Sequence, residues 1–345
     1  MGDFTVDPTD LRVHAKSLAS SVAPAFATSA TTLRQGGQID FPGFGAALSF
    51  VQAVYDQRVD FLAKDLQGAH DVLLEISSRL EQTAAEYARG ENLNITGFQG
   101  TPNPQESYGA ALGSVAPASA AAFAGAAGLS VGVVYATAGS LATCAGLCPT
   151  FIPAAIAAAL FIANPLSIVQ AGTALVNEGR HIQSQLNPDF LSVCTSAAAK
   201  WTGEGKDAFL QLAITIKGHL DIVGKYIETL GTALHSLDIT LTTLWLGLAA
   251  LSVPFLIWLI AMRAAEAIPF AAAAIEPIIE VSGAAASAAV IGTLGGVTAV
   301  ASVAVAMISG LGGDLLTLSS LPDKGAAGVP DMTEFKLETN YQTAL

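Results

Sequence analysis

Apolar residues recur at helical spacing through the first ninety positions and predict a helical hairpin. Residues 7–35 form the first predicted helix, with Asp7 as its N-cap and Pro8 at its first helical position. After a glycine-rich turn, residues 46–90 form a second and longer amphipathic helix. A short turn between two amphipathic helices predicts that they pack antiparallel.

A second hairpin is predicted further along the chain. From residue 178 the sequence is again polar and helical in period, it breaks at "WTGEG" (201–205), and it resumes with an apolar stripe from Phe209 to Leu237. Such a stripe is typical of a helix that packs against another helix. The fold class predicted from these patterns is all-α, with helical hairpins that form an elongated four-helix-type bundle.

Long stretches without charge predict further, membrane-like helical hairpins. Residues 107–177 are uncharged and rich in alanine and glycine, and their composition fits both a membrane span and a buried helix. Residues 239–262 would form about 36 Å of apolar helix, enough to cross a bilayer. Trp245 and Trp258 near its ends are expected in an interfacial aromatic belt. A further uncharged run follows at 281–313.

The pattern divides the chain into five segments. They are an N-terminal hairpin (1–97), a linker with apolar helices (98–177), a second hairpin (178–240), a hydrophobic hairpin expected to insert into membranes (241–318) and a polar tail (319–345).

Composition narrows the functional classes. The 345 residues are 52% hydrophobic and only 12% charged, with a mean hydropathy of +0.53 and a net charge of −13. An acidic chain with few basic residues is a poor candidate for binding nucleic acid. The opening "MGDFTVDPTD" lacks the basic and apolar regions of a signal peptide, so any export is expected to proceed without a Sec or Tat signal.

Residues that could support catalysis are scattered. No nucleophile, zinc or nucleotide motif is present, and we expect no enzyme activity, no cofactor and no metal site. Cys144 and Cys148 lie one helical turn apart and are interpreted as small buried residues, although the spacing leaves their disulfide state open. The five histidines are expected at surfaces or interfaces: His14, His70, His181, His219 and His235.

Two short motifs stand where the helical pattern breaks. Tyr87 and Glu91 form a Tyr-x-x-x-Glu motif at the end of the first hairpin, and Trp201 and Gly203 form a Trp-x-Gly motif between the helices of the second. Each motif is weak alone. Glycine tolerates the positive φ that tight turns need, so the second motif is also consistent with an ordinary turn stapled by a tryptophan.

Together the motifs and hairpins resemble the type VII (ESX) secretion substrates of actinobacteria, the Trp-x-Gly superfamily. Residues 1–97 are similar to its EspC-like subgroup, and residues 178–240 match more loosely. The resemblance implies a four-helix bundle in which Tyr87, Glu91, Trp201 and Gly203 form a composite signal read by the secretion machinery. It also implies a cytosolic chaperone as a partner.

The sequence therefore predicts a non-enzymatic secretion substrate that reaches the cell envelope or the outside and carries a membrane-inserting, pore-forming region. A lipid membrane is an expected partner, and a homo-oligomer is left open. Three carboxylates between the last two apolar runs, Glu266, Glu276 and Glu280, suggest that acidic pH favours insertion, because protonation lowers the cost of moving them into lipid. The alternative is a resident membrane component of the secretion system that uses its hairpins as a docking module.

Overall fold

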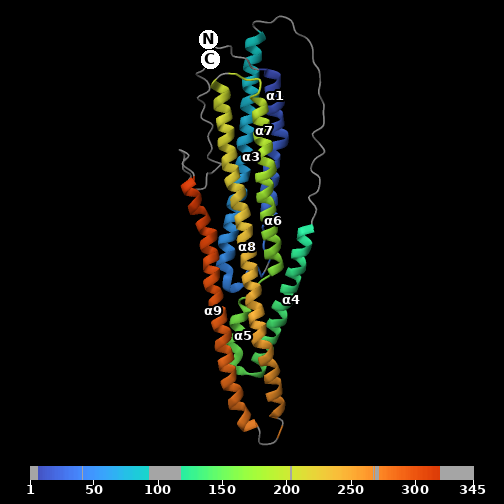
Figure 1. Cartoon of the computed structure of the whole chain (residues 1–345), viewed down its shortest axis with the longest axis vertical. Helices are drawn as coiled ribbons and strands as arrows, with labels where there is room; N and C mark the ends of the chain where they lie inside the picture. The colour runs from blue at the N-terminus through green and yellow to red at the C-terminus, as the bar shows by residue number, and fades with distance from the viewer. Residues whose placement is uncertain are drawn as a thin grey trace.

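The computed structural model is elongated and mostly helical, and it describes residues 7–40, 42–92, 118–202, 204–266, 268 and 272–318 (Figure 1). The predicted all-α fold is confirmed. Nine α-helices are described: α1 (Pro8–Ser17), α2 (Ala23–Gly36), α3 (Ser49–Asn92), α4 (Ala118–Leu147), α5 (Ile152–Ala159), α6 (Pro165–His181), α7 (Asn187–Ala197), α8 (Glu204–Ala265) and α9 (Ala272–Leu318). Short π or 3₁₀ segments complete the described helical elements: η1 (Leu18–Val22), η2 (Ala46–Leu48), η3 (Pro149–Phe151) and η4 (Ile182–Leu186).

The first hairpin pairs the continuous run α1–η1–α2 with α3. The predicted start is confirmed, since the Asp7 carboxylate accepts from the backbone N–H groups of Thr9 and Asp10, and Pro8 is the first helical residue. The Ser77 hydroxyl donates to the carbonyl of Ala15 at 2.7 Å, which sets an antiparallel register. The same register brings the start of α1 level with the C-terminal end of α3.

The second hairpin pairs α6–η4–α7 with the first part of α8. Asn187 donates to Asp221 at 2.7 Å, and Arg180 contacts Glu228 at 2.8 Å. Helix α6 begins at Pro165 and α8 continues to Ala265, so both helices run across segment boundaries predicted at 177/178 and 240/241. The division into five segments itself stays a prediction.

Glycines bring the backbones of α6 and α8 into direct contact at two levels. Gly179 faces Gly224, and one heptad away Gly172 faces Gly231. A Cβ atom at Gly179 would lie 2.5 Å from the carbonyl oxygen of Gly224 and 2.6 Å from the backbone nitrogen of Glu228. Such distances are too short for any side chain, so glycine is required for this approach of the helices.

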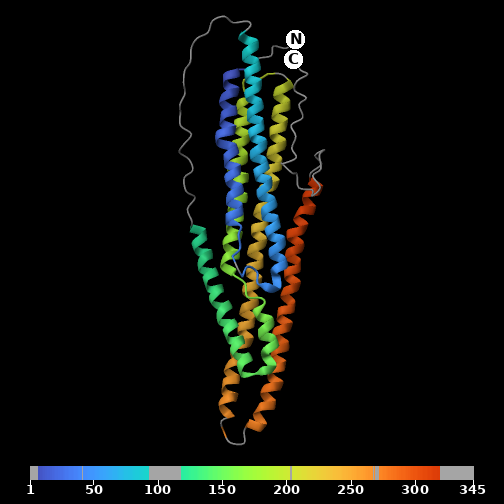
Figure 2. The same ribbon diagram turned by 180° about the vertical axis from the view of Figure 1, so that it is seen from behind.

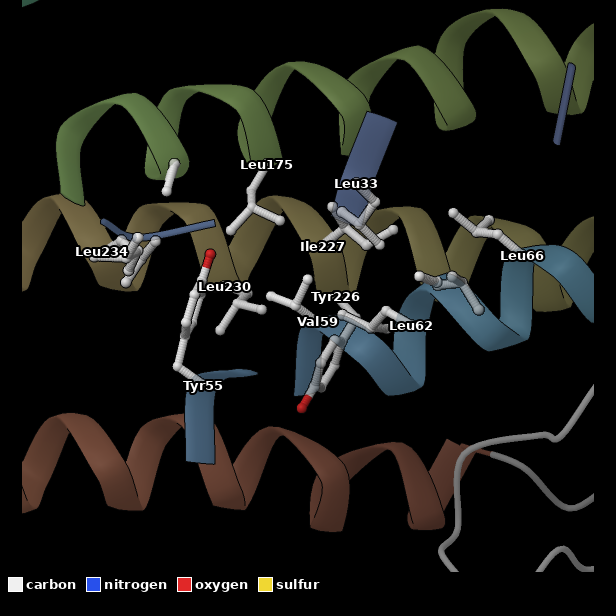
Figure 3. Close-up of a cluster of buried hydrophobic side chains, with 14 of the residues drawn as sticks. Leu33, Tyr55, Val59, Leu62, Leu66, Leu175, Tyr226, Ile227, Leu230 and Leu234 are labelled. Carbon is white, nitrogen blue, oxygen red and sulfur yellow. The ribbon is translucent and has the colours of Figure 1, made fainter. Parts of the chain in front are cut away.

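The two hairpins share one hydrophobic core. Figure 3 shows Leu33 of α2, Val59 and Leu62 of α3, and Leu175 of α6 gathered around side chains of α8 such as Ile227. Several of these side chains are almost fully buried, and each such burial stabilises the fold by roughly 1.5–3 kcal/mol. The hairpins therefore pair within one chain and form the predicted four-helix bundle.

A junction of two loops, which we call the waist, ends the bundle. Gly43 and Gly45 adopt positive φ angles of 60° and 88° in the loop between α2 and α3. The backbone N–H of Asn164 donates to the carbonyl of Gly43 at 2.8 Å, and that of Ala47 donates to the carbonyl of Leu160 at 2.8 Å. The loop that precedes α6 is thereby tied to the first hairpin.

Beyond the waist lies a second helical unit, which we call the apolar half. It contains α4, η3, α5, the part of α8 from residue 241, and α9 up to residue 296. Figures 1 and 2 show these elements converging toward the end of the molecule opposite the start of α1. Helix α9 runs back from this end and contacts α3.

We predict opposite effects for two glycine-to-alanine substitutions in this second hairpin. Gly179→Ala should lower the free energy of unfolding by about 1–3 kcal/mol, because the new methyl group meets backbone atoms that cannot move aside. Gly218→Ala is the matched control, since a Cβ there has no neighbour within 4 Å, and it should stabilise α8 by up to about 1 kcal/mol. Urea unfolding followed by circular dichroism measures both, and equal effects would contradict the close-contact argument.

Candidate functional site

The Trp-x-Gly turn joins α7 to α8. The Trp201 side chain is only 8% exposed and packs on Phe209 with ring centroids 5.8 Å apart. Its indole N–H has no acceptor among the described residues, and its backbone N–H donates to the carbonyl of Ala198 at 3.2 Å. Gly203 lies outside the described residues. Trp201 thus anchors the turn to the start of α8.

Tyr87 is half-buried and packs against the hydrophobic core near the end of α3. Helix α3 continues to Asn92, so the backbone of Glu91 is helical as well. The Tyr motif therefore lies within the last turns of the helix.

An ion-pair cluster links the Trp turn to the start of α1. The Lys200 ammonium lies 3.5 Å from Asp7 and 3.3 Å from Asp10. The backbone N–H of Asp10 is the main reason that the pKa of Asp7 is below its usual range, and Lys200 lowers it further. Because the start of α1 is level with the end of α3, the α7–α8 turn and the end of α3 lie at the same end of the bundle (Figures 1 and 2). We call this the signal end.

At the other end, the apolar half exposes large hydrophobic side chains. Val281 is 72% exposed and Ile257 is 65% exposed. Most of the described large hydrophobic residues that face outward lie here or at its borders: Tyr135, Ile152, Ile156, Leu160, Ile239, Leu246, Leu251, Val253, Ile257, Ile260, Ile268, Ile278, Val281 and Ile291. Exposed apolar side chains gathered on one part of a protein are typical of membrane or protein interaction sites.

Two helical stretches are long and apolar enough to cross a membrane by length and composition, Phe209–Ala265 and Ala272–Gly296. Helix α5 has only eight residues, too few to span a bilayer, and α4 and α5 pack against α8 and α9, respectively. The described part of the region 107–177 is thus partly membrane-like in composition but folded onto other helices.

The expected aromatic belt is wrong for Trp245. This side chain is 1% exposed and belongs to the core, because its position on α8 faces the neighbouring helices. Trp258 is partly buried and stacks on Phe255 with ring centroids 5.6 Å apart.

Two of the three carboxylates proposed as a pH sensor, Glu266 and Glu276, form ion pairs with the same arginine. Arg263 Nη1 lies 2.9 Å from Glu266 and 2.6 Å from Glu276, while its Nε donates to the carbonyl of Leu147 at 2.8 Å. The backbone carbonyl of Glu280 accepts from Thr150 at 3.1 Å. Protonation of Glu266 and Glu276 would therefore also break two ion pairs. Acid-favoured insertion stays a prediction, and vesicle leakage compared at pH 5 and pH 7 tests it.

A hollow of about 780 Å³ opens at the waist, between the α2–α3 loop and Tyr135 of α4. Among the described residues that line it, there is no carboxylate, histidine, lysine, arginine or cysteine. Cys144 and Cys148 are buried and free, which confirms their interpretation as buried residues, and Cys194 is buried and free as well. Within the described ranges, no group of three or more His, Cys, Asp or Glu residues could hold a metal ion.

One histidine departs from the expected surface or interface location. His219 of α8 is 5% exposed, and neither ring nitrogen has a hydrogen-bond partner in the described part of the chain. Burial lowers its pKa to about 4 because the charged ring cannot be solvated. Its place on the apolar stripe of α8 explains this, since the stripe is shared with core residues such as Ile216 and Leu220.

No protein-family model, curated protein or solved structure matches the chain. The resemblance to type VII secretion substrates rests on the motifs and on the paired hairpins.

We predict that His219 makes the bundle sensitive to acid. The pKa of His219 is 6.5 in the unfolded chain and about 4 in the folded protein. Between these values the unfolded chain binds a proton that the folded protein does not, so the free energy of unfolding is highest above pH 6.5 and decreases as the pH falls toward 4. At pH 5 this lowers the free energy of unfolding of the wild type by about 2 kcal/mol, and His219→Leu should abolish that decrease. Denaturant unfolding of wild type and variant at pH 8 and pH 5 measures this, and a stability difference between them that stays the same at both pH values would contradict it.

Proposed function

We propose that the protein is a non-enzymatic type VII secretion substrate that carries a membrane-inserting helical unit to the cell envelope or beyond. The observation that carries the proposal is the outward-facing hydrophobic side chains of the apolar half. Helix α8 connects this half to a four-helix bundle with a polar surface. Water-soluble proteins rarely expose an apolar surface of this size.

The signal end supports the export part of the proposal. Tyr87 and Trp201 lie at one end of the bundle, far along the molecule from the apolar half. In the resemblance described above, these two motifs form a composite signal for the secretion machinery. A signal at this end would remain accessible while a cytosolic chaperone covers the apolar half before export.

A second candidate is a resident membrane component of the secretion system. It is favoured by the same outward-facing side chains, because a chain that already exposes them can enter the membrane of the cell that makes it. In this case the four-helix bundle would act as a docking module, and Tyr87 would have no part in localisation.

Fractionation of the native host separates these two functions. For a secreted substrate, wild type should appear in the culture filtrate or outer envelope, whereas Tyr87→Ala should be retained in the cell. Leu74→Ala is the matched control, because Leu74 is also a partly exposed residue of α3 that lies outside the motif. Wild type and Tyr87→Ala found together in the inner membrane would instead support the resident component.

A charge on the apolar half should prevent its entry into lipid. We predict that Val253→Glu lowers partition into phosphatidylcholine–phosphatidylglycerol vesicles on the order of a hundredfold, since a carboxylate near the middle of a membrane span costs about 2.5–3.5 kcal/mol. Val13→Glu is the matched control on the bundle, because Val253 is 45% exposed and Val13 is 55% exposed.

Vesicle flotation measures partition for the three proteins, and thermal unfolding checks that all of them fold. Equal partition of Val253→Glu and Val13→Glu would show that the apolar half does not contact hydrocarbon.

A further inference from the structure

The apolar half buries small polar side chains beside apolar core residues such as Trp245 and Leu248, and it also turns large apolar side chains outward. Ser252 is 1% exposed, Thr137 is 2% exposed and Ser287 is 5% exposed. On the outer faces of the same helices, Ile257 and Val281 are 65% and 72% exposed. The outer face of a water-soluble helical domain is polar instead.

Several of the inward polar groups form hydrogen bonds between helices. The hydroxyls of Ser140 and Ser252 lie 2.9 Å apart and join α4 to α8. The Thr150 hydroxyl donates to the carbonyl of Glu280 at 3.1 Å, and the Cys148 thiol donates to that of Ile279 at 3.6 Å. These contacts tie the α4–α5 turn to α9. Internal pairing of this kind is what hydrocarbon demands, because it offers polar groups no water.

Charged groups mark the far limit of the unit. Arg263 joins the ends of three helices, since it contacts the carbonyl of Leu147 at the end of α4, Glu266 after α8 and Glu276 near the start of α9. Between this cluster and the bundle, residues 239–262 of α8 carry no charge over about 36 Å. A hydrocarbon layer of about 30 Å fits between the two.

We propose that the apolar half enters the bilayer as one folded unit, with α4 and α5 still packed on α8 and α9. The proposal rests on the membrane role proposed above and specifies its form. Lipid hydrocarbon would contact the outer apolar surface of this unit, and no hairpin has to open to expose that surface. A pore-former that hides its hydrophobic hairpin would require the reverse, a separation of helices before insertion.

A disulfide that locks the helices together tests this directly. A Cβ atom at Gly283 would lie 3.7 Å from the Cβ of Cys148, within the range found in disulfides. Gly283→Cys can therefore bond to the native Cys148 and hold α9 against the α4–α5 turn. The matched control adds Cys148→Ser, which removes the partner thiol.

A second lock guards against misfolding of the first, because the new Cβ would also lie 2.5 Å from the Thr150 hydroxyl. Ser140→Cys with Ser252→Cys replaces the two hydroxyls that are 2.9 Å apart and locks α4 to α8 instead.

Each full-length protein is prepared in an oxidised form and in a form reduced with dithiothreitol, and each form is added to phosphatidylcholine–phosphatidylglycerol vesicles. The inserted protein is the fraction that floats with the vesicles and resists carbonate extraction. We expect locked and reduced proteins to insert equally, within twofold. Insertion that falls tenfold or more on oxidation and returns on reduction would overturn the folded-unit proposal alone. If no form inserts, the membrane role and this inference are both overturned. The same holds if the proteins self-associate in solution and do not float with the vesicles.

Discussion

The direct contact of α6 and α8 at paired glycines determines where α8 lies, and much of the molecule follows from α8. Two glycine pairs one heptad apart let the backbones meet with no side chain between them. Helix α8 is a single helix from Glu204 to Ala265. Its packing against α6 in the bundle therefore also determines the direction in which it runs through the apolar half. Helices α4 and α9 then pack on the second part of α8.

The bundle and the apolar half differ in the side chains that they place inside and on the surface. In the bundle, leucine, isoleucine and aromatic side chains fill the interior, and charged residues such as Arg180 and Glu228 lie outside. In the apolar half, buried hydroxyl and thiol groups form hydrogen bonds between helices beside an apolar core, and branched aliphatic residues also face outward. The change occurs at the waist, where loop backbones hydrogen-bond to each other.

Much of the fold could be predicted because helical period and capping are local signals. Asp7 and Pro8 start α1 as expected, and α3 ends two residues beyond its predicted end. The start of α6 at Pro165 was missed, since an uncharged stretch gives no amphipathic contrast from which to read a boundary. The burial of Trp245 was missed for a related reason, because an all-apolar run does not show which of its faces meets another helix.

The candidate site was less accessible to sequence reasoning. The motif at Tyr87 and the motif at Trp201 are more than a hundred residues apart, and only the packing of the hairpins brings them to one end of the bundle. The ion pair of Arg263 with Glu276 also joins two different helices, α8 and α9, and no local pattern specifies it.

The continuity of α8 also couples the two halves in rotation. Each residue of an α-helix advances about 100° around its axis. One residue inserted between Gly231 and Ile239 would therefore turn every outward side chain of the following half by that angle relative to the glycine contacts. Seven inserted residues would nearly restore the phase. Changes of length in this protein should thus accumulate in its loops, and α8 should vary in sequence while its residue count stays constant.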